Sequence, residues 1–187
     1  NPDLASTYRS LPAPGRDASY RGDVGGLIVQ CAEAQRGVLT ADDLAAYDAE
    51  WVTPLSATYR GWTVYELPPN TQGIAALMML NMMEQYPIGE FGFLSPKAMH
   101  VEIEAKKLAY SDMLRYVADP KFSKVPTASM LSKEQGKARA ALIDPAKAAC
   151  SVEPSRLAGL TDGNGGDTIY LSVIDKDGNI VSLIQSL

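Results

Sequence analysis

Residues 168–187 read TIYLSVIDKDGNIVSLIQSL. Two runs rich in β-branched and aliphatic residues, 168–175 and 179–187, are joined by Lys176-Asp177-Gly178. Runs of this kind around a short loop that contains glycine are typical of a β-hairpin, with Gly178 in the left-handed conformation that a three-residue loop requires. The stretch therefore predicts two antiparallel strands at the C-terminal end of the chain.

The loop also predicts the register of these strands. If Asp175 pairs with Asn179, Thr168 lies opposite Ser186. Side chains directly opposite on one face have Cβ atoms about 4.5–5.5 Å apart, so two hydroxyl residues meet at the far end of the hairpin. Thr168 also directly follows the glycine-rich stretch 161–167. Threonine–serine pairs occur as ordinary sheet contacts, and the pattern alone favours that plainer interpretation.

The sequence before residue 155 predicts mainly short helices. Apolar residues at helical spacing, capping residues and helix-stopping Pro or Gly mark their ends. The predicted helices are 2–10, 20–35, 41–47 after Thr40, 74–86, 97–117 after Ser95-Pro96, one to about residue 142 after Ser132, and a short one from Asp144-Pro145. One strand is predicted at 62–67 because its residues alternate. The predicted fold class is α+β, a mostly helical region followed by a C-terminal β-hairpin.

The composition excludes several classes of protein. The 187 residues are 46% hydrophobic and 21% charged, which is typical of a globular domain. The net charge of -5 leaves no basic stripe for nucleic acid. The longest apolar run, Ile74–Leu80, is too short to span a bilayer, and Asn1-Pro2-Asp3 does not begin a signal peptide. We therefore expect neither a nucleic-acid nor a membrane partner.

Histidine and cysteine are scarce. His100 is the only histidine, and we expect it at the surface or in a capping role. Cys31 and Cys150 allow one disulfide or two free thiols, and neither has metal-ligand spacing around it. Glu102 and Glu104 point to different faces of a helix, so they are expected to be solvated or structural rather than a paired acid and base. No metal and no organic cofactor is expected.

Over nearly its whole length the chain resembles the γ-glutamyltranspeptidase family, which includes glutathione hydrolases and related acylases. The resemblance lies in short motifs that occur in the family's order. These are DLA at 3–5, YRG at 20–22, GVLTADDLAAY at 37–47, TPL at 53–55, YRG at 59–61, PPNTQG at 68–73, EAKKLAY at 104–110, DP at 119–120 and GDTIYLSVIDKDGN at 166–179. The last motif is the most specific.

The resemblance implies a fold and a maturation step. The family fold is a four-layer αββα sandwich of the N-terminal-nucleophile (Ntn) hydrolase type. Its precursors cut their own chain directly before a threonine, which here implies the bond between Asp167 and Thr168. Residues 1–167 would then be the C-terminal part of a large subunit, and residues 168–187 the start of a small subunit. The glycines before Asp167 suit a sharp bend at such a bond.

The same resemblance implies the catalytic residues. Thr168 would be the nucleophile and, once its α-amino group is free, its own base, since that group has a pKa of about 7.7–8.0. The family places a second hydroxyl residue eighteen positions later, which is Ser186 here, where threonine is the more frequent residue. Asp112 matches a family aspartate that is usually followed by arginine. Met113 stands there instead, which implies that a family ion pair or structural contact is missing at this position.

The resemblance covers only the middle of the family's chain. The arginine that holds the substrate carboxylate, the acidic group for its amine and the oxyanion hole lie in parts that are absent here. We therefore expect residues 1–187 to be a single partial domain, inactive alone, that pairs with the other large- and small-subunit segments of its precursor. The expected substrate is a small γ-glutamyl compound or related acyl amide. Exported family members imply a periplasmic or secreted location, and a cytoplasmic one stays open.

A second hypothesis belongs to another class. The chain could be a non-catalytic relative or a helical interaction module that acts through contacts with other proteins. The departure at Met113 favours this alternative. A glycine-rich oxyanion segment in the downstream coding sequence would instead favour the enzyme.

Overall fold

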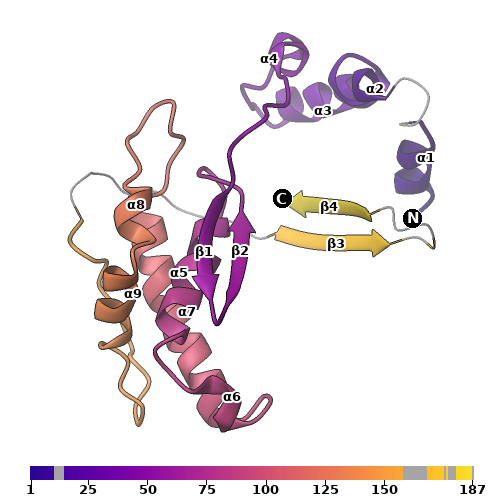
Figure 1. Ribbon diagram of the computed structural model, residues 1–187. Helices are drawn as coiled ribbons and strands as arrows, with labels where there is room; N and C mark the ends of the chain where they lie inside the picture. Colours follow the sequence, from indigo (N-terminus) through magenta and orange to yellow (C-terminus); the bar gives the residue numbers. More distant parts are fainter. Residues whose placement is uncertain (11–14, 158–167, 175, 177–179, 187) are drawn as a thin grey trace. The chain divides into compact units, whose positions relative to one another are not determined.

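The computed structural model describes residues 1–10, 15–157, 168–174, 176 and 180–186. For the strands at 168–174 and 180–186 it describes the backbone and not the side chains. The chain forms two compact units, residues 1–51 and 52–187 (Figure 1). Each unit is built from its own helices, and the second also contains the strands.

The first unit is helical. Its elements are α1 (Pro2–Ser10), α2 (Arg16–Tyr20), α3 (Asp23–Ala34) and α4 (Ala41–Ala46). The opening helix lies where the sequence predicts it. The predicted helix at 20–35 is wrong at its start, because the chain leaves α2 at Arg21 and Gly22 is the extended N-cap of α3. Gly22 packs so closely on α2 that an added Cβ would lie 3.1 Å from the Asp17 carbonyl oxygen.

Local contacts hold α4 in this unit. Thr40 and Asp43 form the predicted capping box, in which the Thr40 hydroxyl accepts from the Asp43 N–H and the Asp43 carboxylate accepts from the Thr40 N–H. The rings of Tyr20 and Tyr47 stack with centroids 5.6 Å apart. The Arg16 guanidinium lies over Tyr20 and donates to the Tyr47 carbonyl, which ties α2 to the end of α4.

The second unit begins with a hairpin in the middle of the chain. Strand β1 (Leu55–Tyr59) pairs antiparallel with β2 (Trp62–Glu66), and Arg60 and Gly61, at φ 49° and 88°, form the two-residue turn. Positive φ at both turn residues matches the right-handed twist of the strands. The sequence predicted a strand here but no partner strand, and it predicted a hairpin only at the C-terminal end of the chain. That expectation was wrong, because β1 and β2 form a hairpin in the middle of the chain. β1 was not predicted although its residues alternate between apolar and polar, because it has only five residues.

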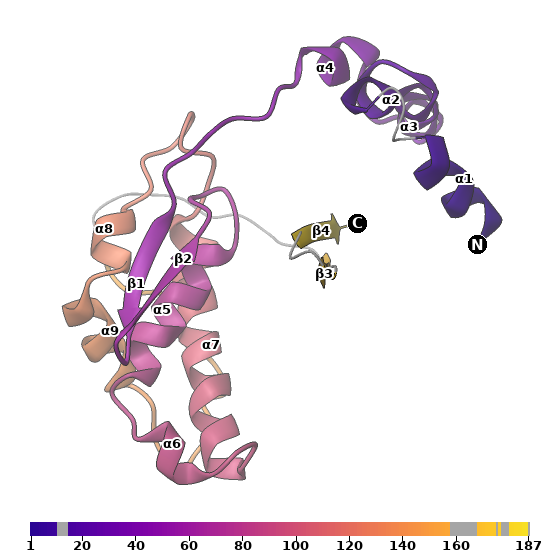
Figure 2. The same cartoon turned by 45° about the vertical axis from the view of Figure 1, so that its right-hand side comes forward.

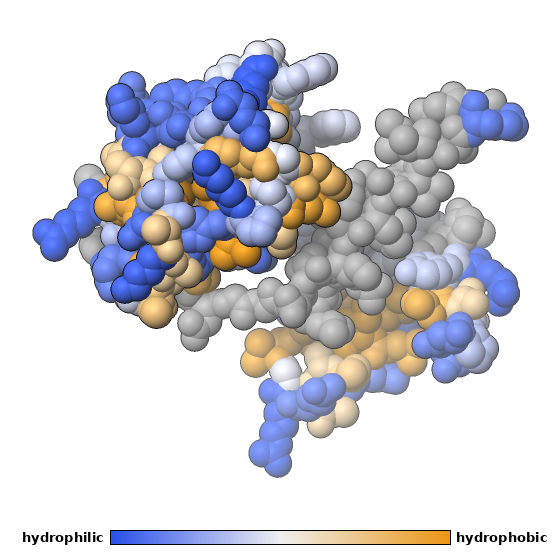
Figure 3. All heavy atoms as spheres, turned by 90° about the horizontal axis from the view of Figure 1, so that it is seen from below, coloured by the Kyte–Doolittle hydropathy of each residue, from blue (hydrophilic) through white to orange (hydrophobic). Residues whose placement is uncertain are grey.

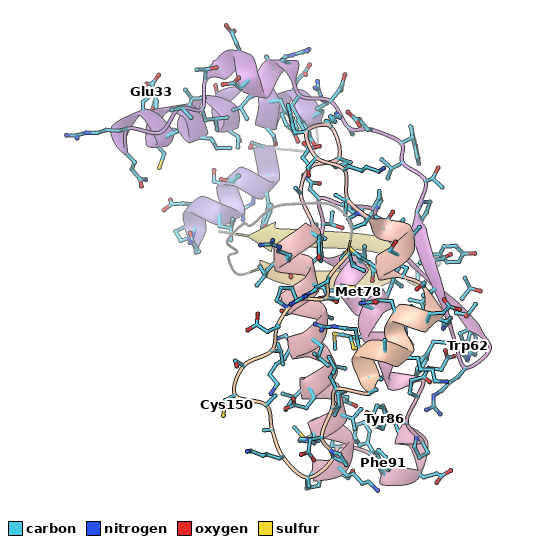
Figure 4. All side chains as sticks on the ribbon, turned by 90° about the vertical axis from the view of Figure 1, so that its left-hand side faces the viewer. Glu33, Trp62, Met78, Tyr86, Phe91 and Cys150 are labelled. Atoms are coloured by element: carbon cyan, nitrogen blue, oxygen red, sulfur yellow. The ribbon has the colours of Figure 1, made fainter. Side chains whose placement is uncertain are left out.

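Two helices form the centre of the second unit. α5 (Gly73–Met83) lies beside α7 (Pro96–Tyr116) in both ribbon views, and α9 (Lys133–Ala140) also packs on α5 (Figures 1 and 2). Short helices α6 (Ile88–Phe91) and α8 (Thr127–Met130) connect these elements. α5 buries residues on several faces, as its sequence predicts, and Met78 and Met82 belong to the core. In Figure 4 the Met78 side chain lies among the helices.

The helix starts follow the predicted caps. Ser95 accepts a hydrogen bond from the Ala98 N–H at α7, and Ser132 accepts one from the Gln135 N–H at α9. The helix predicted from Asp144-Pro145 is wrong, because those residues form turns. The Asp144 carboxylate accepts from the Ala146 N–H at 2.8 Å, and such a side-chain turn replaces the first helical bonds.

Strands β3 (Thr168–Ile174) and β4 (Ile180–Ser186) pair antiparallel. Ile174 is the Cα partner of Ile180, and Thr168 is the partner of Ser186, which is the register that the sequence predicts. The predicted turn at 176–178 lies partly outside the described residues, because only Lys176 of it is described.

Large apolar side chains also reach the surface. Trp51 in the first unit, and Phe93 and Phe122 in the second, are almost completely exposed. Figure 3 shows apolar residues among polar ones on the face seen from below. Within the described part of the chain, no helix combines the length and apolarity needed to cross a bilayer.

Candidate functional site

The two predicted hydroxyl residues are brought together by the strand register. Thr168 begins β3 and Ser186 ends β4, and each is the other's Cα partner. Cα partners of an antiparallel pair lie directly across from each other in the backbone ladder. Asp167, the residue before the predicted scissile bond, lies outside the described residues. The described backbone therefore meets the one geometric condition that the sequence set for this pair.

A stripe of polar side chains runs along α7 toward the segment that precedes the predicted site. Asp112 lies eight residues after Glu104 and four before Tyr116, so the three residues lie on one broad side of the helix. All three are buried, with 2%, 2% and 6% of their surface exposed. A buried carboxylate requires a partner, and each of the two acids has one.

Asp112 pairs with Arg139 of α9. An Asp112 carboxylate oxygen lies 3.1 Å from an Arg139 terminal nitrogen, and both side chains are at least nine-tenths buried. Burial lowers the pKa of Arg139, and the Asp112 charge acts in the opposite direction. Asp112 thus has its ion pair from another helix, and this pair does not involve position 113, where Met113 stands in place of the family's usual arginine.

Sequence reasoning missed Arg139. One signal was available in the spacing of Gly136 and Ala140, which places two small residues on one face of the helix predicted after Ser132. Arg139 lies on that face, since it is three residues after Gly136. An arginine on a buried helix face needs a buried acid, which the spacing alone does not identify.

Glu104 is the second buried acid of the stripe. One of its carboxylate oxygens lies 2.5 Å from the Lys107 ammonium, and the other accepts from the Ala149 N–H at 3.3 Å. Of the two expected roles, solvated or structural, the structural one is confirmed. His100, one helical turn before it, is half-buried, and its Nε2 lies 2.8 Å from the Asp144 carbonyl oxygen.

Three of the stripe's neighbours reach the backbone of residues 149–157, which we call the tail segment. Lys107 donates to the Ala149 carbonyl at 2.6 Å, and Ser111 donates to the Val152 carbonyl at 3.2 Å. Arg139 donates to the Glu153 carbonyl at 2.9 Å. Cys150, labelled in Figure 4, is exposed on this segment, and like Cys31 it is a free thiol.

A separate polar cluster joins the β1–β2 turn to the helices. The Glu84 carboxylate accepts from the Lys133 ammonium at 2.6 Å and from the Arg60 N–H at 3.1 Å. These two hydrogen bonds lower the pKa of Glu84. Tyr86 donates to the Ala140 carbonyl at 2.7 Å, and burial raises its pKa. These groups bond one another or the backbone, so we assign them a structural role.

No metal centre is formed by the residues that the structure describes, since no three of their His, Cys, Asp and Glu side chains gather closely enough. What the described residues do provide is a register that pairs two hydroxyl residues and a polar stripe that holds the chain before them.

Comparison with known proteins places this arrangement in a family. The model of the γ-glutamyltranspeptidase family matches residues 1–187. The glutathione hydrolase proenzyme of Escherichia coli (strain K12) is 37% identical over 188 residues, which cover 99% of this chain and 32% of that protein. The acylase ACY 1 proenzyme of Pseudomonas sp. (strain SE83) is 37% identical over 99% of this chain and 32% of its own length.

A solved structure agrees with these relatives. The crystal structure of cephalosporin acylase from Bacillus halodurans is similar with a TM-score of 0.72 and 34% identity, over 97% of this chain and 31% of that one. The chain thus spans about a third of the length of the relatives it matches. Since the family model covers every residue, the chain belongs to the γ-glutamyltranspeptidase family of Ntn-hydrolases.

Proposed function

We propose that this chain is the part of a self-processing precursor that contains its cleavage site and its nucleophile, Thr168. The mature protein would transfer or hydrolyse a γ-glutamyl or related acyl group through a threonyl ester. The observation that carries this proposal is the family match over residues 1–187, together with the position of Thr168 after a glycine-rich stretch and opposite Ser186.

Maturation would follow from the chemistry of threonine. The Thr168 hydroxyl oxygen attacks the carbonyl carbon of Asp167, the peptide C–N bond breaks, and the nitrogen keeps its electron pair and takes a proton. The result is an ester with a free α-amino group on Thr168. Water then hydrolyses the ester, which leaves a carboxyl group on Asp167 and restores the hydroxyl. The new α-amino group can accept the hydroxyl proton in later turnovers near neutral pH.

Ser186 is the residue proposed to position the Thr168 hydroxyl. The register places the two residues opposite each other, and a serine hydroxyl can both donate and accept. On this proposal residues 1–167 end the large subunit, residues 168–187 start the small subunit, and other segments of the same precursor complete an αββα sandwich. Neither a metal nor an organic cofactor takes part in the proposed step.

The relatives suggest two substrate classes. Some are glutathione hydrolases by name, which favours γ-glutamyl amides, and one solved relative is a cephalosporin acylase, which favours other acyl amides. The non-catalytic alternative rests on the departure at Met113, which the Asp112–Arg139 pair does not remove. The family match over residues 1–187 favours the enzyme over that alternative.

The test is an assay of the product of the complete reading frame with a γ-glutamyl anilide. Thr168→Ala removes the nucleophile, so release of the aniline should fall to background. Thr168→Ser keeps a hydroxyl and should retain measurable activity. Full activity in Thr168→Ala would contradict the proposed function. An acyl amide of the cephalosporin type, assayed in parallel, separates the two substrate classes.

A further inference from the structure

The tail segment is held by its backbone. Side chains of α7 and α9 bond carbonyl or N–H groups at Ala149, Val152, Glu153, Ser155 and Leu157. Contacts to the backbone depend on where the chain lies and little on which side chains it carries. These contacts therefore fix where the backbone of the tail segment lies on α7 and α9.

Tyr116 and Asp112 make the contacts closest to the end of the segment. The Asp112 carboxylate accepts from the Ser155 N–H at 2.6 Å. The Tyr116 hydroxyl accepts from the Leu157 N–H at 2.8 Å and donates to the Ser155 carbonyl. The single Tyr116 hydroxyl thus bonds two backbone groups near the end of the tail segment, at Ser155 and Leu157.

The segment runs parallel to α7. Contacts begin between Glu104 and Ala149 and end between Tyr116 and Leu157. The helix rises about 18 Å over those twelve residues. The eight residue steps from Ala149 to Leu157 would cover about 26–29 Å if fully extended, so the segment has enough length to follow the helix face without being fully extended.

Burying the charged side chains of this contact costs solvation free energy, which their hydrogen bonds and ion pairs offset. Asp112, Glu104 and Arg139 are desolvated, and each reaches the tail backbone. Buried ions of this kind are stable only when paired and hydrogen-bonded. Val152 and Leu157 also pack against the hydrophobic core, which adds apolar contacts at two points of the segment.

We propose that Tyr116, with Ser111 and the Asp112–Arg139 pair, are positioning residues for the cleavage before Thr168. They fix the chain at Leu157, eleven residues before Thr168, so the scissile bond can lie no more than about 36–40 Å from that point. The same contacts keep residues 149–157 of the large fragment docked on α7 after cleavage. This inference rests on the proposed function, because it concerns the rate of the self-processing step.

The experiment compares two tyrosines of one helix. Tyr116→Phe removes only the hydroxyl that bonds the tail segment, whereas Tyr110→Phe removes a hydroxyl that bonds the Gln72 side chain. The complete precursor is synthesised in a cell-free reaction, and its conversion into two fragments is followed with time. The measurement is made well below the unfolding temperature of every variant, so that folding is not limiting.

We expect Tyr116→Phe to slow conversion at least about tenfold, because it removes two hydrogen bonds to the tail segment. Tyr110→Phe should convert at the wild-type rate. Ser111→Ala, a second variant that loses one bond to Val152, should slow conversion less. Once processed, all variants should have wild-type kcat and KM, which a general structural defect would not predict.

Two failures can be told apart. If wild-type protein is cut and Tyr116→Phe is cut equally fast, the positioning role is overturned and the proposed function stands. Equal slowing in Tyr116→Phe and Tyr110→Phe also overturns the positioning role. If the wild-type precursor is never cut, the proposed function fails, and the positioning role fails with it.

Discussion

At the residue scale the main feature is one buried ion pair. Asp112 and Arg139 are almost fully buried, and the arginine also bonds the carbonyls of Leu108 and Glu153. A pair of this kind contributes little relative to two apolar residues, but the loss of one partner leaves an uncompensated charge. The pair therefore constrains α7, α9 and the tail segment together.

Arg139→Met should lower the free energy of unfolding by about 3–5 kcal/mol, since Asp112 stays buried without a partner. The matched control is Lys133→Met, which breaks the more exposed pair with Glu84 and should cost about 1 kcal/mol or less. Urea unfolding measures both values. Equal costs for the two variants would contradict the assignment of a buried pair.

Glu84 carries a pH dependence. The Lys133 bond, and then the Arg60 N–H, lower its pKa, so its ionised form stabilises the fold above the unfolded pKa of about 4.3. That contribution is lost as the pH falls through the lower, folded value. Glu84→Gln should therefore destabilise the protein at pH 7, and the difference should shrink as the pH falls below about 4.3. A difference that urea unfolding finds constant with pH would contradict this.

At the element scale, close approach of α5 and α9 determines how the helices pack. A Cβ added to Gly136 would lie 2.7 Å from the Asn81 Cβ and 3.1 Å from the Asn81 carbonyl carbon. Asn81 is fully buried and donates to the Leu131 carbonyl at 2.9 Å, so it cannot move without breaking that bond. Gly136 is thus required by contact rather than by backbone conformation.

Gly136→Ala should destabilise the protein by about 1–3 kcal/mol through overpacking, against the usual stabilisation of about 0.5–1 kcal/mol for this change inside a helix. Gly26→Ala in α3 is the control, because no atom lies within 4 Å of the added Cβ there. It should leave stability unchanged or raise it. Thermal unfolding of the two variants measures the sign, and stabilisation by Gly136→Ala would show that the helices can separate.

Features that depend on residues close together in the sequence were largely predictable. Contacts between residues far apart in the sequence were not. The caps at Thr40, Ser95 and Ser132 were predictable because each bond joins residues three positions apart. The register that pairs Thr168 with Ser186 followed from one short loop. The Asp112–Arg139 pair did not follow from the sequence, because it joins two helices. β1 was missed although Leu55, Ala57 and Tyr59 alternate with Ser56 and Thr58, because it has only five residues and its pairing with β2 joins separate segments of the chain.

At the scale of the whole molecule, the chain is a partial structure of its family. It folds into two compact units, yet it spans about a third of the length of the relatives it matches. The described part of the second unit ends its helical region in a docked tail segment, and then begins a strand at Thr168. This order suits a precursor whose two products separate between those elements.

The most direct test of self-processing at Thr168 is the intact mass of the product of the complete reading frame. We predict two chains, of which the smaller has Thr168 as its first residue, and a single uncut chain for Thr168→Ala. A single uncut chain from the wild-type protein, or a smaller chain that begins at another residue, would contradict the account.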